Sequence, residues 1–208
     1  MPVDFVTHSA APLACVSASG AVRPIARRLA HGYHCPDSAL LAAARDSASR
    51  SGPPGRVSAV GTFRSPAVFG QLGEALGAAL ASALREDFEW YVCRGAFFHN
   101  DAHFESVLFG VWCVHGPAAH MVFPRAGVRL PAAPGNLVVF DPYEVHGVLA
   151  ASKATYAAED YEDAEPSVFV GFELSLEPVC DAFGVAAAIE GRAISSQTRI
   201  AATTGDID

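Results

Sequence analysis

The sequence predicts a mainly β protein with α-helices near its N-terminus, and two observations support this fold class. Before about residue 87 the chain is Ala-rich with helical periodicity, whereas short β-branched and aromatic runs separated by Gly and Pro follow it. A chain of 208 residues that is 51% hydrophobic and 17% charged is also long enough to bury one core. We therefore expect one domain, with a helical extension packing on the sheet over residues 1–86, a β core over 87–176, and a closing helix and flexible tail over 177–208.

Two helices are expected in the first part of the chain. PDSALLAAARDSASR opens with Pro36-Asp37 and ends before the turn SGPPG. The second helix begins with an N-cap at Ser65 and a proline at Pro66, and its apolar residues then recur at intervals of three or four. These residues form a stripe that should pack against a sheet: Phe69, Leu72, Leu76, Leu80 and Ala83. RVSAVGTF, between the helices, predicts a short strand.

The second part of the chain predicts an antiparallel sandwich or barrel. Several short runs bounded by turn residues have strand character: FEWYVCRGAFFHN, SVLFGVWCVHG, AHMVF, GVRLP, NLVVFD, VHGVLA and SVFVGFELSL. The acidic stretch KATYAAEDYEDAEP interrupts them and should be a solvated loop over one end of the sheet. PVCDAFGVAAAIEG is expected to form the closing helix, and ISSQTRIAATTGDID the mobile tail.

Composition argues against several functional classes. A formal net charge of -8 argues against a nucleic-acid partner, because such partners select clustered Lys and Arg. No run is long and apolar enough for a membrane helix, and the first residues lack the basic charge of a signal peptide. The 5 cysteines form no C-x-x-C pair, which disfavours a disulfide framework or a zinc ribbon. We expect a cytoplasmic protein with no membrane partner, and the sequence leaves its oligomeric state open.

The stretch FFHNDAHF predicts a metal site. If this stretch is a strand, His99 and Asp101 point to the same face, and the run APGNLVVFDPYEVHGV offers His146 as a third ligand. Two histidines and one carboxylate of this kind occupy one face of an octahedral iron(II) and leave the opposite positions open, which suits catalysis. His103 competes with His99, because it also lies two residues from Asp101.

These residues resemble the motif of the iron(II)- and 2-oxoglutarate-dependent oxygenases with a double-stranded β-helix, in which His-x-Asp is followed by a distal His. The resemblance covers about residues 88–176 and includes the Pro-Gly turn and apolar strand before His146. It implies a jelly-roll (cupin-like) core, iron(II) held by His99, Asp101 and His146 as the catalytic centre, and 2-oxoglutarate and O2 as cosubstrates. The implied reaction is hydroxylation or desaturation of an unactivated C–H bond in a small-molecule substrate. The carboxylate of Asp101 disfavours halogenation, because halogenating relatives replace it with a small residue.

The sequence departs from that family at the cosubstrate anchor. Members commonly begin the strand after the distal His with an Arg or Lys, and SVFVGFELSL has no basic residue. Arg125, Arg129 and Arg94 are the candidates to replace it, with Lys153 a weaker one and a hydroxyl from Ser167 or Ser175 assisting. Either one of them anchors the 2-oxo acid, or the enzyme does not use it.

Two other hypotheses remain from the sequence. A cupin-like metalloenzyme would bind a divalent metal without a 2-oxo acid, and the missing anchor favours it. A non-catalytic jelly-roll binding domain would use the same His and Asp residues as structural groups, with the apolar residues of FFHNDAHF facing a partner. Metal binding separates the first of these from the second.

Overall fold

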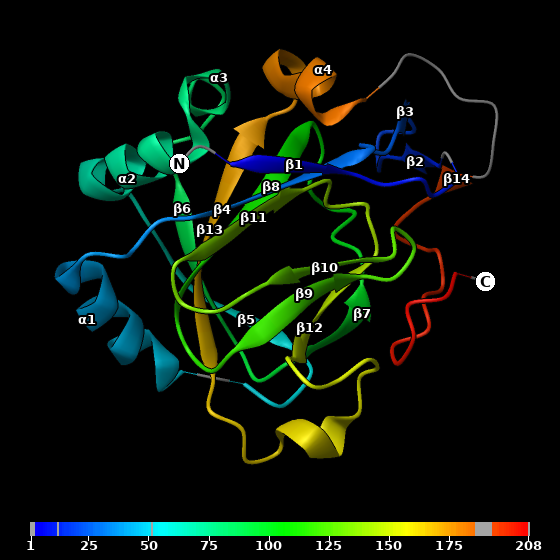
Figure 1. Ribbon diagram of the computed structural model, residues 1–208. Helices are drawn as coiled ribbons and strands as arrows, with labels where there is room; N and C mark the ends of the chain where they lie inside the picture. The colour runs from blue at the N-terminus through cyan, green and yellow to red at the C-terminus, as the bar shows by residue number, and fades with distance from the viewer. Residues whose placement is uncertain (1–2, 12, 51, 186–192, 208) are drawn as a thin grey trace.

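Two antiparallel sheets form the body of the protein in the computed structural model, which describes residues 3–11, 13–50, 52–185 and 193–207 (Figure 1). The larger sheet has seven strands. In spatial order they are β1 (Asp4–Thr7), β4 (Arg28–Tyr33), β11 (Asn136–Phe140), β8 (Val107–His115), β13 (Ser167–Ser175), β6 (Phe88–Cys93) and β5 (Val57–Phe63).

The second sheet has four strands and packs face to face with the first. Its order is β10 (Val128–Pro131), β9 (Ala119–Phe123), β12 (His146–Ala150) and β7 (Ala96–His99). A small third sheet joins β14 (Ala193–Ile194), β2 (Ala14–Val16) and β3 (Val22–Pro24). The two larger sheets give the mainly β, antiparallel sandwich that the sequence predicts.

Strand alternation divides the apolar residues of the seven-stranded sheet between two cores. Along β13, Val168, Val170 and Phe172 belong to the core beneath the helices. Phe169 belongs instead to a second core, together with Met121 of the four-stranded sheet. Because residues two apart share a face, one strand supplies both cores, and the second core lies between the two sheets.

Three helices cover the outer face of the seven-stranded sheet, on the left of Figure 1: α1 (Ser38–Ala48), α2 (Pro66–Leu76) and α3 (Ala78–Ala81). Their buried residues join the core beneath them, Leu72 and Leu80 among them. The helices therefore shield this face of the sheet from solvent, while the opposite face is free to line an interior site.

The ends of these helices follow from local sequence. The Asp37 carboxylate accepts a hydrogen bond from Leu40 N at 2.8 Å at the start of α1. Ser65 caps α2, and Pro66 occupies its first turn, where a missing N–H costs nothing. The long helix expected over 65–86 is broken at Gly77, whose φ of 76° ends α2 and begins α3.

The N-terminal part of the chain is not only a helical extension. Its strands β1, β4 and β5 join the seven-stranded sheet, where β4 pairs with β11 and β5 with β6. β5 corresponds to the strand expected at RVSAVGTF, whereas β1 and β4 were not expected. The sequence of β4, RLAHGY, is short and poor in β-branched residues, so its pairing with a distant strand decides its structure.

The acidic stretch 153–166 packs on the outer face of the four-stranded sheet. It contains the 3-10 helix η1 (Ala158–Tyr161). Tyr156 and Tyr161 are buried in a cluster with Leu149, and their rings stack with centroids 5.3 Å apart. The acidic side chains point outward, so two tyrosines anchor a stretch that composition alone predicts to be solvated.

The C-terminal residues also pack on this sheet. After η2 (Glu177–Val179) comes only a short helix, α4 (Cys180–Phe183), and the rest of the expected closing helix lies largely outside the described residues. Further on, the Ala202 carbonyl accepts a hydrogen bond from Phe98 N at 3.0 Å. The tail expected to be mobile is therefore tied to β7. No helix in the described ranges is long and apolar enough to cross a membrane.

Candidate metal centre

The structure brings together the three residues that the sequence selects as metal ligands. One ligand atom from each of His99, Asp101 and His146 lies within 4.8 Å of the others. His99 Nε2 is 3.7 Å from Asp101 Oδ1, and His146 Nε2 is 3.4 Å from Asp101 Oδ2. His99 and Asp101 come from β7 and the loop directly after it, whereas His146 comes from β12, which is distant in the sequence.

An irregular strand pairing aims both histidines at the same point. His146 of β12 lies opposite His99 of β7, and Val148 lies opposite Ala96. Two steps along β12 therefore match three steps along β7, which is a β-bulge. Because of the extra residue, Ala96 and His99 both line the interior, although regular alternation would place them on opposite faces.

Strand alternation, which the sequence suggests, is not what places Asp101 in the site. Strand β7 ends at His99, so Asp101 lies in the loop that follows. Its backbone N–H donates to the Pro142 carbonyl at 2.7 Å, and its carbonyl accepts from Phe104 N at 3.0 Å. The loop before His146 therefore also holds Asp101, and strand alternation is not the reason that the carboxylate faces the two imidazoles.

Backbone carbonyls fix the tautomer of both histidines. His99 Nδ1 lies 2.7 Å from the Phe97 carbonyl, and His146 Nδ1 lies 2.9 Å from the Glu144 carbonyl. A carbonyl only accepts hydrogen bonds, so Nδ1 carries the proton and the Nε2 lone pair is left free on each neutral ring. These free nitrogens are the two atoms that face Asp101.

The surroundings favour the protonation states that a cation requires. Burial, and then the nearby His146, lower the pKa of His99, so its ring stays neutral. Burial opposes ionisation of Asp101, but the neighbouring histidines prevail and lower the pKa of the carboxyl. Metal ligands must be deprotonated, and the lowered pKa values of His99 and Asp101 favour this state for both side chains.

The donor set fits iron(II). Two imidazole nitrogens and one carboxylate oxygen form the facial triad that non-haem iron enzymes use. Ligand atoms at about 2.1 Å from one ion and at right angles to each other lie about 3 Å apart. Here the two imidazoles lie 3.7 and 3.4 Å from different oxygens of Asp101, and one ligand atom of each residue lies within 4.8 Å of the others. His99, Asp101 and His146 are therefore the residues that would hold the ion.

Two buried ion pairs hold the loop that carries His146. The Asp141 carboxylate is 1% exposed and accepts from Arg23 at 2.6 and 3.0 Å and from Ala26 N at 2.9 Å. The Glu144 carboxylate is also 1% exposed and is paired with Arg125, whose Nε lies 3.0 Å from Oε1. Sequence reasoning missed these pairs. The only signal was the two acidic residues in the otherwise apolar run NLVVFDPYEVHGV, and their partners are not local.

The arginines proposed as cosubstrate anchors lie elsewhere. Arg125 is committed to Glu144, and Arg129 Nη2 donates to the Lys153 carbonyl at 2.6 Å. Arg94 donates to the backbone carbonyls of Gly52 and Glu162. None of these three arginines lines the cavity beside the metal ligands.

The other proposed polar partners also lie apart from the cavity. Lys153 Nζ pairs with Asp160 at 2.6 Å on the outer side of the four-stranded sheet. Ser175 Oγ lies 3.3 Å from Arg85 Nε, and the side chain of Ser167 is buried. Neither serine lines the cavity beside the triad.

His103 lies beside the site without joining the triad. Its ring is exposed and packs on Phe104 with centroids 4.2 Å apart. It lines the cavity, but the group of converging ligand atoms contains His99 instead. Of the two ligand sets that the sequence leaves open, the geometry favours the one with His99.

A cavity of about 200 Å³ adjoins the triad between the two sheets. Its walls come from strands of both sheets and from the loop after β7. Most of the lining is apolar, and the aromatic side chains among it are Tyr91, Phe104, Phe109, Phe140 and Phe169. Metal ligands at the wall of an apolar cavity are the arrangement expected of a catalytic centre with a buried substrate.

Comparisons with known proteins found solved structures with low similarity to this chain. No protein-family model and no curated protein matches the chain. Among solved structures, a prolyl-4-hydroxylase from Pseudomonas putida is 18% identical with a TM-score of 0.43, over 70% of this chain and 91% of that one. A non-heme alpha-ketoglutarate dependent epimerase from nogalamycin biosynthesis is 16% identical with a TM-score of 0.39, over 70% and 76%. A cupin 2 domain-containing protein from Halorhodospira halophila is 15% identical with a TM-score of 0.32, over 66% and 86%.

Proposed function

We propose that this chain is a metal-dependent oxygenase that holds iron(II) with His99, Asp101 and His146 and oxidises a small molecule in the adjoining cavity. The observation that carries this proposal is the convergence of the three ligand atoms at the wall of an apolar cavity. Iron(II) bound on one face by such a triad keeps positions for O2 and for a substrate or cosubstrate, and it supplies oxidising chemistry there.

The residues of the chain prepare the site for this chemistry. The carbonyls of Phe97 and Glu144 place the proton of each neutral ring on Nδ1 and orient both Nε2 atoms toward one point. The ionised Asp101 supplies the single negative charge. The apolar walls exclude water from the space where the substrate lies, which protects a reactive site from side reactions.

Two forms of this activity are compatible with the triad. In the first, 2-oxoglutarate is the cosubstrate and the enzyme hydroxylates or desaturates an unactivated C–H bond, as the motif implies. In the second, a cupin-like oxygenase binds its substrate at the metal without a 2-oxo acid. One observation favours the second form: within the described ranges, no Arg or Lys lines the cavity. The far carboxylate of 2-oxoglutarate would be buried there without a partner, which is costly.

An anaerobic titration distinguishes the two forms. The metal-free protein is loaded with iron(II), and 2-oxoglutarate is then added while the visible spectrum is recorded. A charge-transfer band that is lost in His99→Ala and His146→Ala but kept in His103→Ala would establish the first form. Iron binding with no band at saturating 2-oxoglutarate would favour the second. If the chain binds no iron, the metalloenzyme proposal is wrong and a structural role for the triad replaces it.

A further inference from the structure

The aromatic rings of the cavity form one continuous wall that reaches a metal ligand. Phe109 stacks with Phe104 at 4.9 Å between ring centroids, and it contacts Tyr91 and Phe140 edge to face, each at 5.8 Å. Phe140 in turn lies 4.5 Å from the ring of His146. Aromatic ligands gain from both the stacked and the edge-to-face geometry, because the rings carry a negative face and a positive edge.

A glycine on the central strand β13 makes room for this wall. A Cβ at Gly171 would lie 2.3 Å from Tyr91 Cε2 and 3.2 Å from Phe109 Cζ. Any side chain at this position would push one or both rings from their places. The absence of a side chain at Gly171 therefore leaves room beside the sheet for both rings.

The cavity offers no charged partner besides the metal ligands. Among the residues that the structure describes, its other ionisable lining groups are Tyr91, Cys93 and His103. The Tyr91 hydroxyl donates to the carboxylate of Glu89, so it is already committed. Cys93 is fully buried, and burial raises its pKa to about 12, which keeps the thiol neutral. His103 is exposed and packs on the Phe104 ring, with centroids 4.2 Å apart.

The volume sets an upper size for the ligand. Ligand sites for drug-sized molecules measure about 300–1,000 Å³, and a dry apolar cavity of about 150 Å³ accepts benzene. At about 200 Å³, this cavity matches a molecule of one or two fused rings. A larger substrate would have to extend past exposed lining residues such as Ala59 and His103.

We infer that the substrate is a small, uncharged, flat apolar molecule, of the size of one or two fused aromatic rings, that lies on the wall formed by Tyr91, Phe104, Phe109 and Phe140. This inference rests on the proposed function for its chemistry, but the binding itself does not require the metal. The wall supplies affinity through ring contacts, and the lack of a cation rejects carboxylates. Oxidation would then occur at the part of the molecule nearest to His146.

Calorimetric binding to the metal-free protein tests the inference with a matched pair of probes, indole and indole-3-carboxylate. The two probes differ by one negative charge, and no iron is present to bind the carboxylate. We expect saturable binding of indole that is at least about tenfold tighter than that of its carboxylate. Equal affinities, or no binding of indole to a protein that still binds iron(II), would overturn the substrate class and leave the proposed metalloenzyme standing.

A pair of arginine variants tests whether the two probes bind in the cavity. Ala59 lines the rim of the cavity from the edge strand β5 and is exposed, so an arginine is tolerated there. Ala59→Arg should strengthen binding of the carboxylate and reduce the preference for indole. Thr62→Arg adds the same charge on the same strand outside the cavity lining and should leave the preference unchanged. If both variants change the preference equally, the probes bind elsewhere and the inference fails.

Discussion

The backbone carbonyl of Glu144 accepts a hydrogen bond from His146 Nδ1 at 2.9 Å, so a residue two positions before a metal ligand sets the orientation of that ligand. The Glu144 side chain is buried and paired with Arg125, which lies in the turn between β9 and β10. The ion pair therefore holds the loop that presents His146. We regard Arg125 and Glu144 as positioning residues, since neither lines the cavity.

Removing one partner of this pair should weaken both the fold and the metal site. Arg125→Met leaves a buried carboxylate without a counter-ion, which should lower the free energy of unfolding by about 3–5 kcal/mol. Iron(II) affinity should fall by about 10–100-fold, as is typical when the group that orients a metal ligand is lost. Chemical denaturation and an anaerobic iron titration measure the two effects.

Two further variants make this prediction specific. Arg129→Met removes a surface arginine that donates to a backbone carbonyl, and it should change stability by less than about 0.5 kcal/mol. The double variant Arg125→Met/Glu144→Met should regain most of the lost stability, because an apolar pair can replace a buried ion pair. If Arg125→Met were as stable as the wild type, the pair would not hold the loop.

Gly171→Ala should compress the cavity wall. The added methyl group would overlap the Tyr91 ring, so we expect a loss of about 1–3 kcal/mol in the free energy of unfolding and weaker binding of indole. Gly70→Ala on the exposed side of α2 is the matched control. Nothing lies within 4 Å of its added Cβ, and a helical alanine should stabilise the protein by about 0.5–1 kcal/mol. We expect thermal and chemical unfolding to show that Gly171→Ala lowers the free energy of unfolding and that Gly70→Ala raises it.

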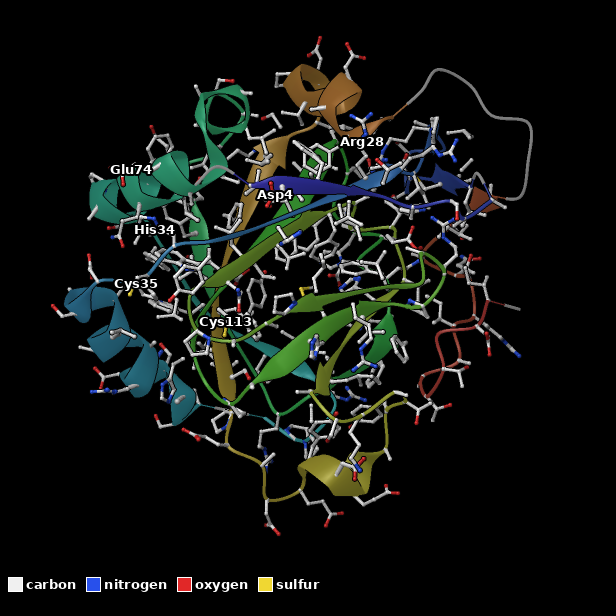
Figure 2. All side chains as sticks on the ribbon, viewed as in Figure 1. Asp4, Arg28, His34, Cys35, Glu74 and Cys113 are labelled. Atoms are coloured by element: carbon white, nitrogen blue, oxygen red, sulfur yellow. The ribbon has the colours of Figure 1, made fainter. Side chains whose placement is uncertain are left out.

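The cysteines should differ sharply in reactivity. Cys35 is exposed, whereas Cys93 and Cys113 are buried, and Figure 2 shows Cys113 within the body of the molecule. Burial raises the pKa of each buried thiol to about 12, so at pH 8 roughly one in ten thousand is ionised. Iodoacetamide followed by peptide mapping should label Cys35 first and reach Cys93 and Cys113 only after unfolding. Rapid labelling of Cys113 in the native protein would contradict this assignment.

A buried histidine outside the metal site should make stability depend on pH. His8 is 4% exposed, and burial followed by the charge of Arg125 lowers its pKa below 6.5. The unfolded chain therefore binds a proton more readily, so this contribution to stability is present above pH 6.5 and is lost as the pH falls through the folded pKa. His8→Gln should flatten the fall in stability of the metal-free protein between pH 7 and pH 5. An unchanged slope would show that His8 is not protonated on unfolding.

Local patterns predicted much of the β fold but not its N-terminal strands. The runs after residue 87 combine β-branched and aromatic residues with turn signals, and each has a counterpart from β6 to β13. β1 and β4 lack such a pattern, and pairing with distant strands specifies them. The two tyrosines that anchor the acidic stretch 153–166 on the sheet were not predicted, because charged residues dominate its composition.

The sequence predicted those parts of the site that depend on the spacing of the motif residues. His99 and His146 followed from the motif, although a bulge that no sequence pattern revealed is what aims His99 inward. Asp101 was selected on strand alternation, while a hydrogen bond to the Pro142 carbonyl holds it in place. The position of Arg125 depends on a buried partner in a different loop, so the sequence alone could not predict that it turns away from the cavity.

The most direct test of the central claim is the amount of iron(II) that the metal-free protein binds under anaerobic conditions. We expect one tightly bound ion per chain, lost in His99→Ala, Asp101→Ala and His146→Ala and retained in His103→Ala, with circular dichroism showing that all four variants are folded. Binding that survives in folded His99→Ala and His146→Ala variants, or that is absent from the wild type, would contradict the account.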